Sequence, residues 1–138
     1  MVAAQFTGGC LCDAIRYRAS EVPDTVCICH CTSCRRSTGA VMSGWATFRA
    51  PHFELTQGEL TQFASSPGVQ RGHCARCGSA ITYRNAARPT EVDVTLATLD
   101  EPAVLAPTAH IWIRDKLPWV RIGDDLPQHD ASLPESGT

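Results

Sequence analysis

Lysines, basic runs and long apolar stretches are scarce in this sequence. Lys116 is the one lysine among twelve basic residues, and no basic cluster is denser than Arg35 and Arg36. The formal net charge is −2. A protein that binds the phosphate backbone of nucleic acids normally carries a basic stripe, so we expect no nucleic-acid partner. No apolar run approaches the roughly 18 to 20 residues of a membrane-spanning helix, so we also expect no membrane partner.

A secretory signal is a second feature that the sequence lacks. The first residues, MVAAQFTGG, contain neither the basic segment nor the apolar segment of such a signal. We therefore expect a cytoplasmic protein, whose thiols the glutathione and thioredoxin systems keep reduced. The eight cysteines would then serve metal binding or catalysis. A small disulfide scaffold whose signal has been removed stays open as the alternative.

Long helical patterns are also scarce. Glycine and proline interrupt the sequence at short intervals, and the segments between them alternate or are rich in β-branched residues. The clearest such segments are residues 14–19, 44–50, 80–84, 91–99 and 109–115. This period of two predicts a mainly β protein with antiparallel sheets and little helix. The one helical candidate is the short segment CTSCRRSTGA, which ends at about Gly39.

The chain has the length of one domain. With 138 residues, 43% of them hydrophobic, it can bury a core without covalent staples. We find no repeat and no linker, and we expect a single domain over residues 1–127. Residues 128–138 are polar and contain proline, so we expect a disordered C-terminal tail there. The sequence does not indicate an oligomeric state.

Two cysteine pairs can form one closed metal site. Side chains at positions i and i+2 of a strand share a face, so Cys10 and Cys12 on a strand would direct two sulfurs at one point. Cys74 and Cys77 form a C-x-x-C turn, and the following Gly78 can adopt the positive φ that such turns often need. Four thiolates close a tetrahedral zinc site, which is the pattern of a structural zinc.

The remaining cysteines lie in the stretch CICHCTSC, residues 27–34. Cys29, Cys31 and Cys34 combine a same-face strand pair with a C-x-x-C turn, so three sulfurs can converge. In an extended strand Cys27 lies about 13 Å from Cys31, at roughly 3.3 Å per residue, which is too far for a shared ion unless the backbone bends. Three protein ligands with one open coordination position are typical of a catalytic zinc.

An open three-cysteine site suits thiol chemistry. A thiol that enters the open position loses its proton to the metal's charge, and the thiolate is the nucleophile. A small aldehyde held nearby could then be attacked at its carbon. Three alternatives stay open: Cys27 as a fourth zinc ligand after a backbone bend, an iron–sulfur cluster, whose common spacings differ, and a single nucleophilic cysteine.

The cysteine clusters and their neighbours resemble a known family. The motifs are G-G-C-x-C near the start, C-H-C-x-x-C-R-R-S-T-G, C-x-x-C-G-S about forty residues later, and HIWIRDKLPW at residues 110–119. They are similar to the glutathione-dependent formaldehyde-activating enzyme family, also called the CENP-V/GFA domain. The resemblance covers residues 8–127.

This resemblance implies an Mss4-like fold, with antiparallel β-sheets around zinc, and a carbon–sulfur lyase-type activity that condenses formaldehyde with glutathione to S-hydroxymethylglutathione. It implies one structural zinc, with the ligands Cys10, Cys12, Cys74 and Cys77. It also implies one catalytic zinc, with the catalytic ligands Cys29, Cys31 and Cys34. The implied partners are glutathione or another small thiol and a small aldehyde. The sequence departs from the family pattern at His73, where an aromatic residue is usual, and in the extra thiol Cys27.

Two other functions stay open. A non-catalytic zinc module would use both clusters as scaffold and bind a protein or a small molecule, whereas a related thiol-dependent enzyme would act on another electrophile. Arg35 and Arg36 could grip the carboxylates of glutathione or be solvated surface charges. We expect His30 to be packed or solvent-facing, and His110 is the one histidine that we consider as a proton carrier.

Overall fold

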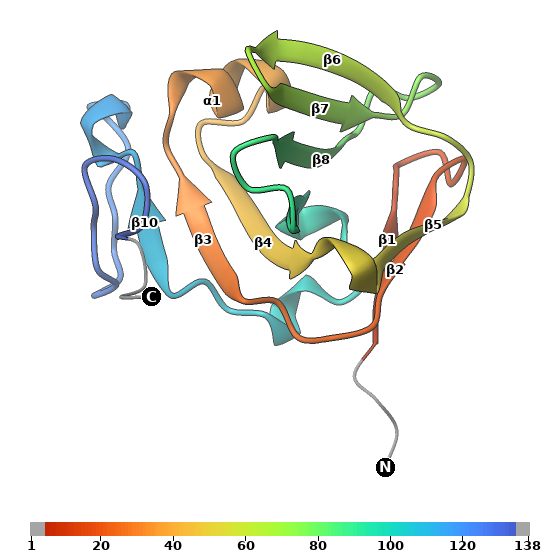
Figure 1. The fold of residues 1–138 in the computed structure, drawn as a ribbon. Helices are drawn as coiled ribbons and strands as arrows, with labels where there is room; N and C mark the ends of the chain where they lie inside the picture. The colour runs from red at the N-terminus through yellow and green to blue at the C-terminus, as the bar shows by residue number, and fades with distance from the viewer. Residues whose placement is uncertain (1–4, 135–138) are drawn as a thin grey trace.

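The computed structural model describes residues 5–134, in which two β-sheets are formed (Figure 1). The three-stranded sheet contains β1 (Phe6–Gly9), β2 (Arg16–Ala19) and β5 (Phe53–Gln57), in that order. The seven-stranded sheet has the order β10-β3-β4-β9-β8-β7-β6. Its strands are β3 (Thr25–Cys29), β4 (Ser43–Arg49), β6 (Thr61–Ser66), β7 (Val69–His73), β8 (Ala80–Asn85), β9 (Glu91–Thr95) and β10 (Ala109–Ile111). The pairings are antiparallel except for the parallel pair of β3 and β10.

The predicted fold class is confirmed, and each predicted strand segment contains a strand. Two of these segments, 91–99 and 109–115, extend well past the C-terminal end of their strands. β9 ends at Thr95 because the 3-10 segment η2 (Leu96–Thr98) follows it. β10 ends at Ile111 because Trp112 takes the left-handed conformation, with φ 57°, before the 3-10 segment η4 (Ile113–Asp115). Two further 3-10 segments are η1 (Ala50–His52) and η3 (Pro102–Val104).

The predicted helix is confirmed as α1 (Thr32–Thr38), the single α-helix in the part of the chain that the structure describes. Its N-cap is Cys31, whose sulfur accepts a hydrogen bond from the backbone N–H of Cys34. Its C-cap is Gly39, at φ 75°, where the lack of a side chain makes the left-handed conformation easy. None of the helical segments within residues 5–134 is long and apolar enough to cross a membrane.

Strand alternation gives the seven-stranded sheet two different faces. In β9, Val92 and Val94 are buried in the main core, while Asp93 points to the opposite face. In β4, Ala46 and Phe48 are core residues in the same way. The three-stranded sheet contributes Tyr17 and Ala19 to this core, so the apolar residues of both sheets meet in one cluster. The opposite face of the large sheet carries polar residues, cysteines and the two aromatic residues Trp45 and Tyr83.

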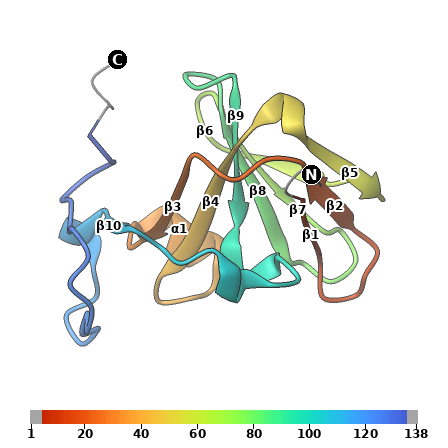
Figure 2. The ribbon, with the colours of Figure 1, turned by 90° about the horizontal axis from the view of Figure 1, so that it is seen from below.

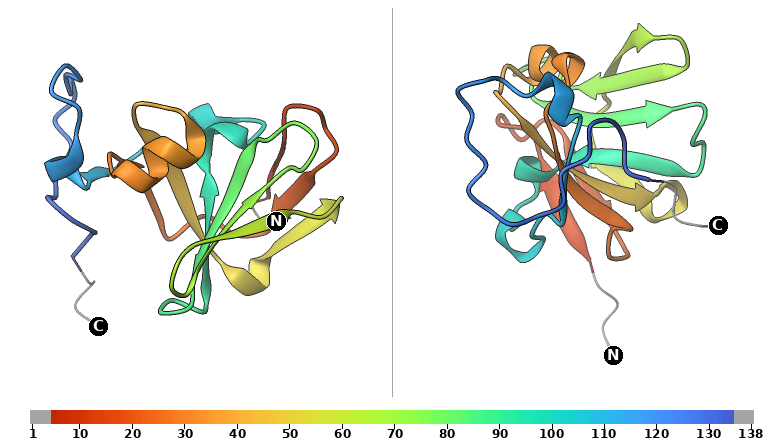
Figure 3. Two further views of the ribbon diagram at one scale, coloured as in Figure 1. Left: turned by 90° about the horizontal axis from the view of Figure 1, so that it is seen from above. Right: turned by 90° about the vertical axis from the view of Figure 1, so that its left-hand side faces the viewer.

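The C-terminal segment runs along the outer side of β10, away from the three-stranded sheet (Figures 2 and 3). The N–H of His110 donates to the carbonyl of Pro127 at 2.9 Å, and the N–H of His129 donates back to His110 at 2.9 Å. Trp112 donates to Ala131 at 3.0 Å. Of the expected tail, residues 135–138 lie outside the described residues, and the domain boundary after residue 127 stays a prediction.

A buried histidine pair joins this segment to the centre of the fold. His30 and His110 are 0% and 3% exposed, and Nε2 of His30 lies 2.9 Å from Nδ1 of His110. Nε2 of His110 lies 2.9 Å from a carboxylate oxygen of Asp124. The ionised carboxylate accepts from Nε2–H of His110, so a neutral His110 accepts at Nδ1 from His30. Burial lowers the pKa of His30, and the charge of Lys116 acts in the same direction, which favours its neutral form.

We predict that His110→Ala lowers the free energy of unfolding by about 2 kcal/mol, because it leaves the buried Nε2–H of His30 without an acceptor. The measurement is urea unfolding of the protein. His52→Ala is the control, since the side chain of His52 is 39% exposed and its removal should cost less than about 0.5 kcal/mol. Equal losses in the two variants would contradict a special role for the buried pair.

Candidate metal centres

Four cysteines from two distant turns form the first cluster, cluster 1. Its members are Cys10, Cys12, Cys74 and Cys77, and their sulfur atoms all lie within 4.8 Å of one another. Cys12 lies 3.6 Å from Cys10 and 3.8 Å from Cys74, measured between sulfurs. Four sulfurs at about 2.3 Å from one zinc would be separated by about 3.8 Å in a tetrahedron. The donor set and the spacing therefore fit zinc.

The backbone of the C-x-x-C turn positions Cys74 and Cys77, the second pair of cluster 1. Gly78 has φ 81°, as the C-x-x-C-G pattern predicts, and its N–H donates to the carbonyl of Cys74 at 2.9 Å. The N–H groups of Arg76 and Cys77 donate to the sulfur of Cys74 at 3.3 and 3.4 Å. Hydrogen bonds from the hydroxyl and backbone of Ser79 lower the pKa of Cys77 to about 5. These donors favour the thiolate form, which is the form that binds a metal.

The first half of cluster 1 requires a correction. The sequence predicted Cys10 and Cys12 on a strand, but β1 ends at Gly9 and both cysteines lie in the turn that follows. Asp13 closes this turn with φ 64°, and its N–H donates to the carbonyl of Cys10 at 3.2 Å. The N–H of Ile15 donates to the sulfur of Cys10 at 3.2 Å. A turn, rather than strand alternation, brings these two sulfurs together.

The second cluster, cluster 2, consists of Cys29, Cys31 and Cys34, whose sulfur atoms lie within 4.8 Å of one another. The predicted same-face strand pair is wrong here, because β3 ends at Cys29 and α1 begins at Thr32. Cys31 is instead the N-cap of α1, and Cys34 lies one helical turn further on. The change from strand to helix at the end of β3 therefore brings the three sulfurs close together.

Cluster 2 concentrates negative charge on one sulfur. Hydrogen bonds with the thiols of Cys29 and Cys34 lower the pKa of Cys31, and the backbone N–H of Cys34 and the charge of Arg71 add to this effect. The contacts with Cys31 and Cys34, together with burial, raise the pKa of Cys29. Three close sulfurs, of which Cys31 is favoured as the thiolate, are a soft donor set that suits zinc.

Cys27 lies beside cluster 2 and is not part of it. β3 remains extended through Cys29, and Cys27 is directly opposite Trp45 on β4. Burial raises the pKa of Cys27 to about 11, so the thiol stays protonated at neutral pH. Among the described residues, the group of sulfurs within 4.8 Å at this site contains Cys29, Cys31 and Cys34 without Cys27. The backbone bend that would bring in a fourth sulfur is not present.

A cavity of about 1030 Å³ opens beside cluster 2. A row of residues that face one another across five adjacent strands lies along its wall: Thr25, Thr47, Asp93, Tyr83 and Arg71. Trp112 and residues 132–134 of the C-terminal segment also line it. This face of the large sheet is thus one wall of the cavity.

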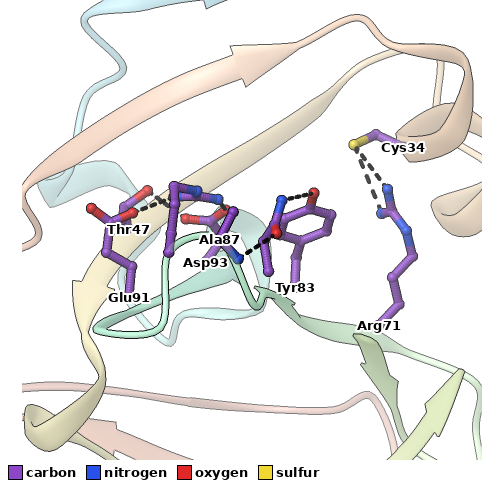
Figure 4. Close-up of polar contacts among 9 residues, drawn as sticks. Cys34, Thr47, Arg71, Tyr83, Ala87, Glu91 and Asp93 are labelled. Atoms are coloured by element: carbon purple, nitrogen blue, oxygen red, sulfur yellow. Dashed lines mark hydrogen bonds and ion pairs between the residues drawn. The ribbon is translucent and has the colours of Figure 1, made fainter. Parts of the chain in front are cut away.

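The two ends of this cavity differ in charge (Figure 4). At one end, Arg71 of β7 reaches the sulfur of Cys34, at 3.8 Å from Nη1. At the other, Asp93 accepts hydrogen bonds from the hydroxyl of Thr47 at 2.6 Å and from Arg88 at 2.8 Å. Arg88 also pairs with Glu91. The site therefore joins a cysteine cluster with its own arginine to a carboxylate network.

The remaining candidates from the sequence lie elsewhere. Arg35 and Arg36 belong to α1 and do not line the cavity, and Arg35 donates to the hydroxyl of Thr32 at 3.2 Å. Sequence reasoning missed Arg71 and Asp93. A signal for Asp93 was present in the segment EVDVT, where acidic residues alternate with buried valines, but no local pattern singles out Arg71.

Comparisons with known proteins agree with this architecture. A family model described as glutathione-dependent formaldehyde-activating enzyme matches residues 5–115. An uncharacterised lyase of Schizosaccharomyces pombe is 28% identical over 95 residues, which span 67% of this chain and 68% of that protein. A crystal structure of a Rhodobacter sphaeroides protein has the same fold, with a TM-score of 0.58 at 21% identity, over 88% of this chain and 98% of that one. Because the family model covers most of the sequence, the predicted resemblance is confirmed, and the chain belongs to the glutathione-dependent formaldehyde-activating enzyme family.

Proposed function

We propose that this chain is a zinc-dependent carbon–sulfur lyase-type enzyme that joins a small thiol to a small aldehyde, with glutathione and formaldehyde as the expected pair. The observation that carries the proposal is the three-cysteine cluster, which lines a cavity of about 1030 Å³. Family membership and the lyase of Schizosaccharomyces pombe support the reaction class.

The two clusters would divide the work between them. Cluster 1 offers four cysteine ligands, which is a closed donor set and suits a structural zinc. Cluster 2 offers three cysteine ligands at the cavity wall, so Cys29, Cys31 and Cys34 would hold the catalytic zinc. Bound there, zinc would supply a charge that lowers the pKa of an incoming thiol and a Lewis acid that polarises a carbonyl oxygen.

The residues of the cavity would bind and orient the reactants. Trp45 and Tyr83, whose ring centroids are 6.1 Å apart, form an apolar wall next to cluster 2 and would exclude water from the aldehyde. The sulfur of the thiol forms a bond to the carbonyl carbon, and the proton of the thiol ends on the new hydroxyl group. The net reaction needs no oxidant and no reductant.

We also propose a cytoplasmic location. All eight cysteines are free thiols, and two groups of them are placed to bind metal. Such sites persist where glutathione and thioredoxin keep sulfur reduced. The same compartment would supply glutathione as the thiol partner.

We predict that Cys31→Ser abolishes glutathione-dependent activity and leaves the fold largely intact, because it removes a central ligand of cluster 2 and no core residue. The measurement is the rate of S-hydroxymethylglutathione formation above the uncatalysed rate. Native mass spectrometry of the same samples should show a glutathione adduct on the parent and none on the variant. Retained activity in Cys31→Ser would contradict the mechanism.

Cys27→Ser is the matched variant for this experiment, since Cys27 lies on the same strand as Cys29 but outside cluster 2. It should keep the zinc content and the glutathione adduct of the parent. A parent that carries both zinc ions but forms no adduct at millimolar glutathione would favour a non-catalytic zinc module. A panel of aldehydes and thiols would identify a different electrophile.

We predict that Cys77→Ser damages the fold more than Cys31→Ser does. Loss of a ligand from a structural site forfeits metal-binding energy that is also folding energy. Native mass spectrometry should show one zinc fewer per chain, and the urea midpoint should fall well below that of Cys31→Ser. Identical unfolding curves for parent, Cys31→Ser and Cys77→Ser would show that the proposed division of labour is wrong.

A further inference from the structure

Arg71 links the strand that carries it to the helix that carries Cys34. Its Nη1 and Nη2 atoms lie 3.8 and 3.9 Å from the sulfur of Cys34, and Nη1 also donates to the hydroxyl of Ser37 at 3.2 Å. Figure 4 shows the side chain reaching from β7 to this sulfur. Among the described residues, it is the cationic side chain that contacts cluster 2.

The guanidinium is held in place by its own partners. Nε donates to the hydroxyl of Ser65 at 3.1 Å, and the guanidinium carbon lies 4.9 Å from the centre of the Tyr83 ring. An arginine has five N–H groups, and these contacts direct all but one of them at protein atoms. Arg71 therefore has little capacity left to grip a substrate carboxylate, and its charge stays fixed beside the sulfur.

The net charge of cluster 2, with a divalent metal and a thiol bound, indicates a role for Arg71. Three thiolates around one divalent cation leave a net negative charge, and a thiolate that joins them increases it. Negative charge in a partly buried site is costly without a nearby cation. Arg88, the other arginine of the cavity wall, already pairs with Glu91 and Asp93. Arg71 is thus the cation that is placed to offset the added charge.

We propose that Arg71 is a positioning residue whose charge favours the binding of a thiol, as its thiolate, beside Cys34. This inference rests on the proposed function, because it takes cluster 2 to bind a metal and a thiol. Arg71 would raise the affinity for the sulfur atom of the thiol. It would not recognise the rest of the thiol molecule. An uncharged thiol should therefore depend on Arg71 as strongly as glutathione does.

The experiment is calorimetric titration of the zinc-loaded protein with glutathione and with 2-mercaptoethanol, from about pH 6 to about pH 9. Arg71→Gln should weaken the binding of both thiols about tenfold at neutral pH and raise by about one unit the pH at which half of the sites bind thiol. Arg71→Lys keeps the charge and should recover most of the affinity. Arg84→Gln removes an equal charge from an exposed position on β8 and should bind both thiols like the parent.

The outcomes separate this inference from the proposed function. If the parent binds both thiols and Arg71→Gln binds them equally well, the role of Arg71 is overturned and the proposed function stands. Weakened binding of glutathione alone would assign Arg71 to a carboxylate and overturn charge compensation. Loss of zinc from both the Gln and the Lys variant would make Arg71 a structural part of cluster 2, which also overturns the proposal. A parent that binds neither thiol would overturn the proposed function itself.

Discussion

The convergence of four sulfurs from two distant turns is the constraint on which the rest of the structure depends. Cys10 and Cys12 follow a strand of the three-stranded sheet, while Cys74 and Cys77 connect β7 to β8 in the seven-stranded sheet. A metal in cluster 1 would therefore cross-link the two sheets. It would also close a loop of some sixty residues, and the entropy that loop closure removes from the unfolded chain grows with loop length. Because β7 and β8 carry Arg71 and Tyr83, this cross-link also sets the position of the cavity wall.

Cluster 2 depends on a different constraint, which is local. The strand β3 ends and the helix α1 begins within the C-H-C-T-S-C segment, so a change of secondary structure brings its three sulfurs together. The helix start supplies a backbone N–H for the sulfur of Cys31, and β7, which is not adjacent to β3 in the sheet, supplies the guanidinium of Arg71. Local chain geometry thus brings the three sulfurs of cluster 2 together, and the sheet places the positive charge of Arg71 beside them.

Much of this could be predicted from the sequence. The mainly antiparallel β fold, the short helix that ends at Gly39 and the two groups of cysteines follow from alternation, glycine and spacing. The backbone form of C-x-C could not be predicted in the same way. Both a strand and a turn can bring the sulfurs at positions i and i+2 together. The turn at Cys10 and Cys12 is stabilised by the positive φ of Asp13 and by backbone hydrogen bonds around it.

The sequence by itself determined which cysteines gather into the two clusters, because the reach of a C-x-x-C segment is local and its sulfurs converge in any fold that accommodates the turn. Only the tertiary structure decided what surrounds them. Arg71 meets Cys34 across 37 positions and His30 meets His110 across 80, through strand order and register. The exclusion of Cys27 from cluster 2 follows from the straight course of β3 between β4 and β10. Such contacts arise from pairing between distant strands, and no local pattern specifies which strands will pair.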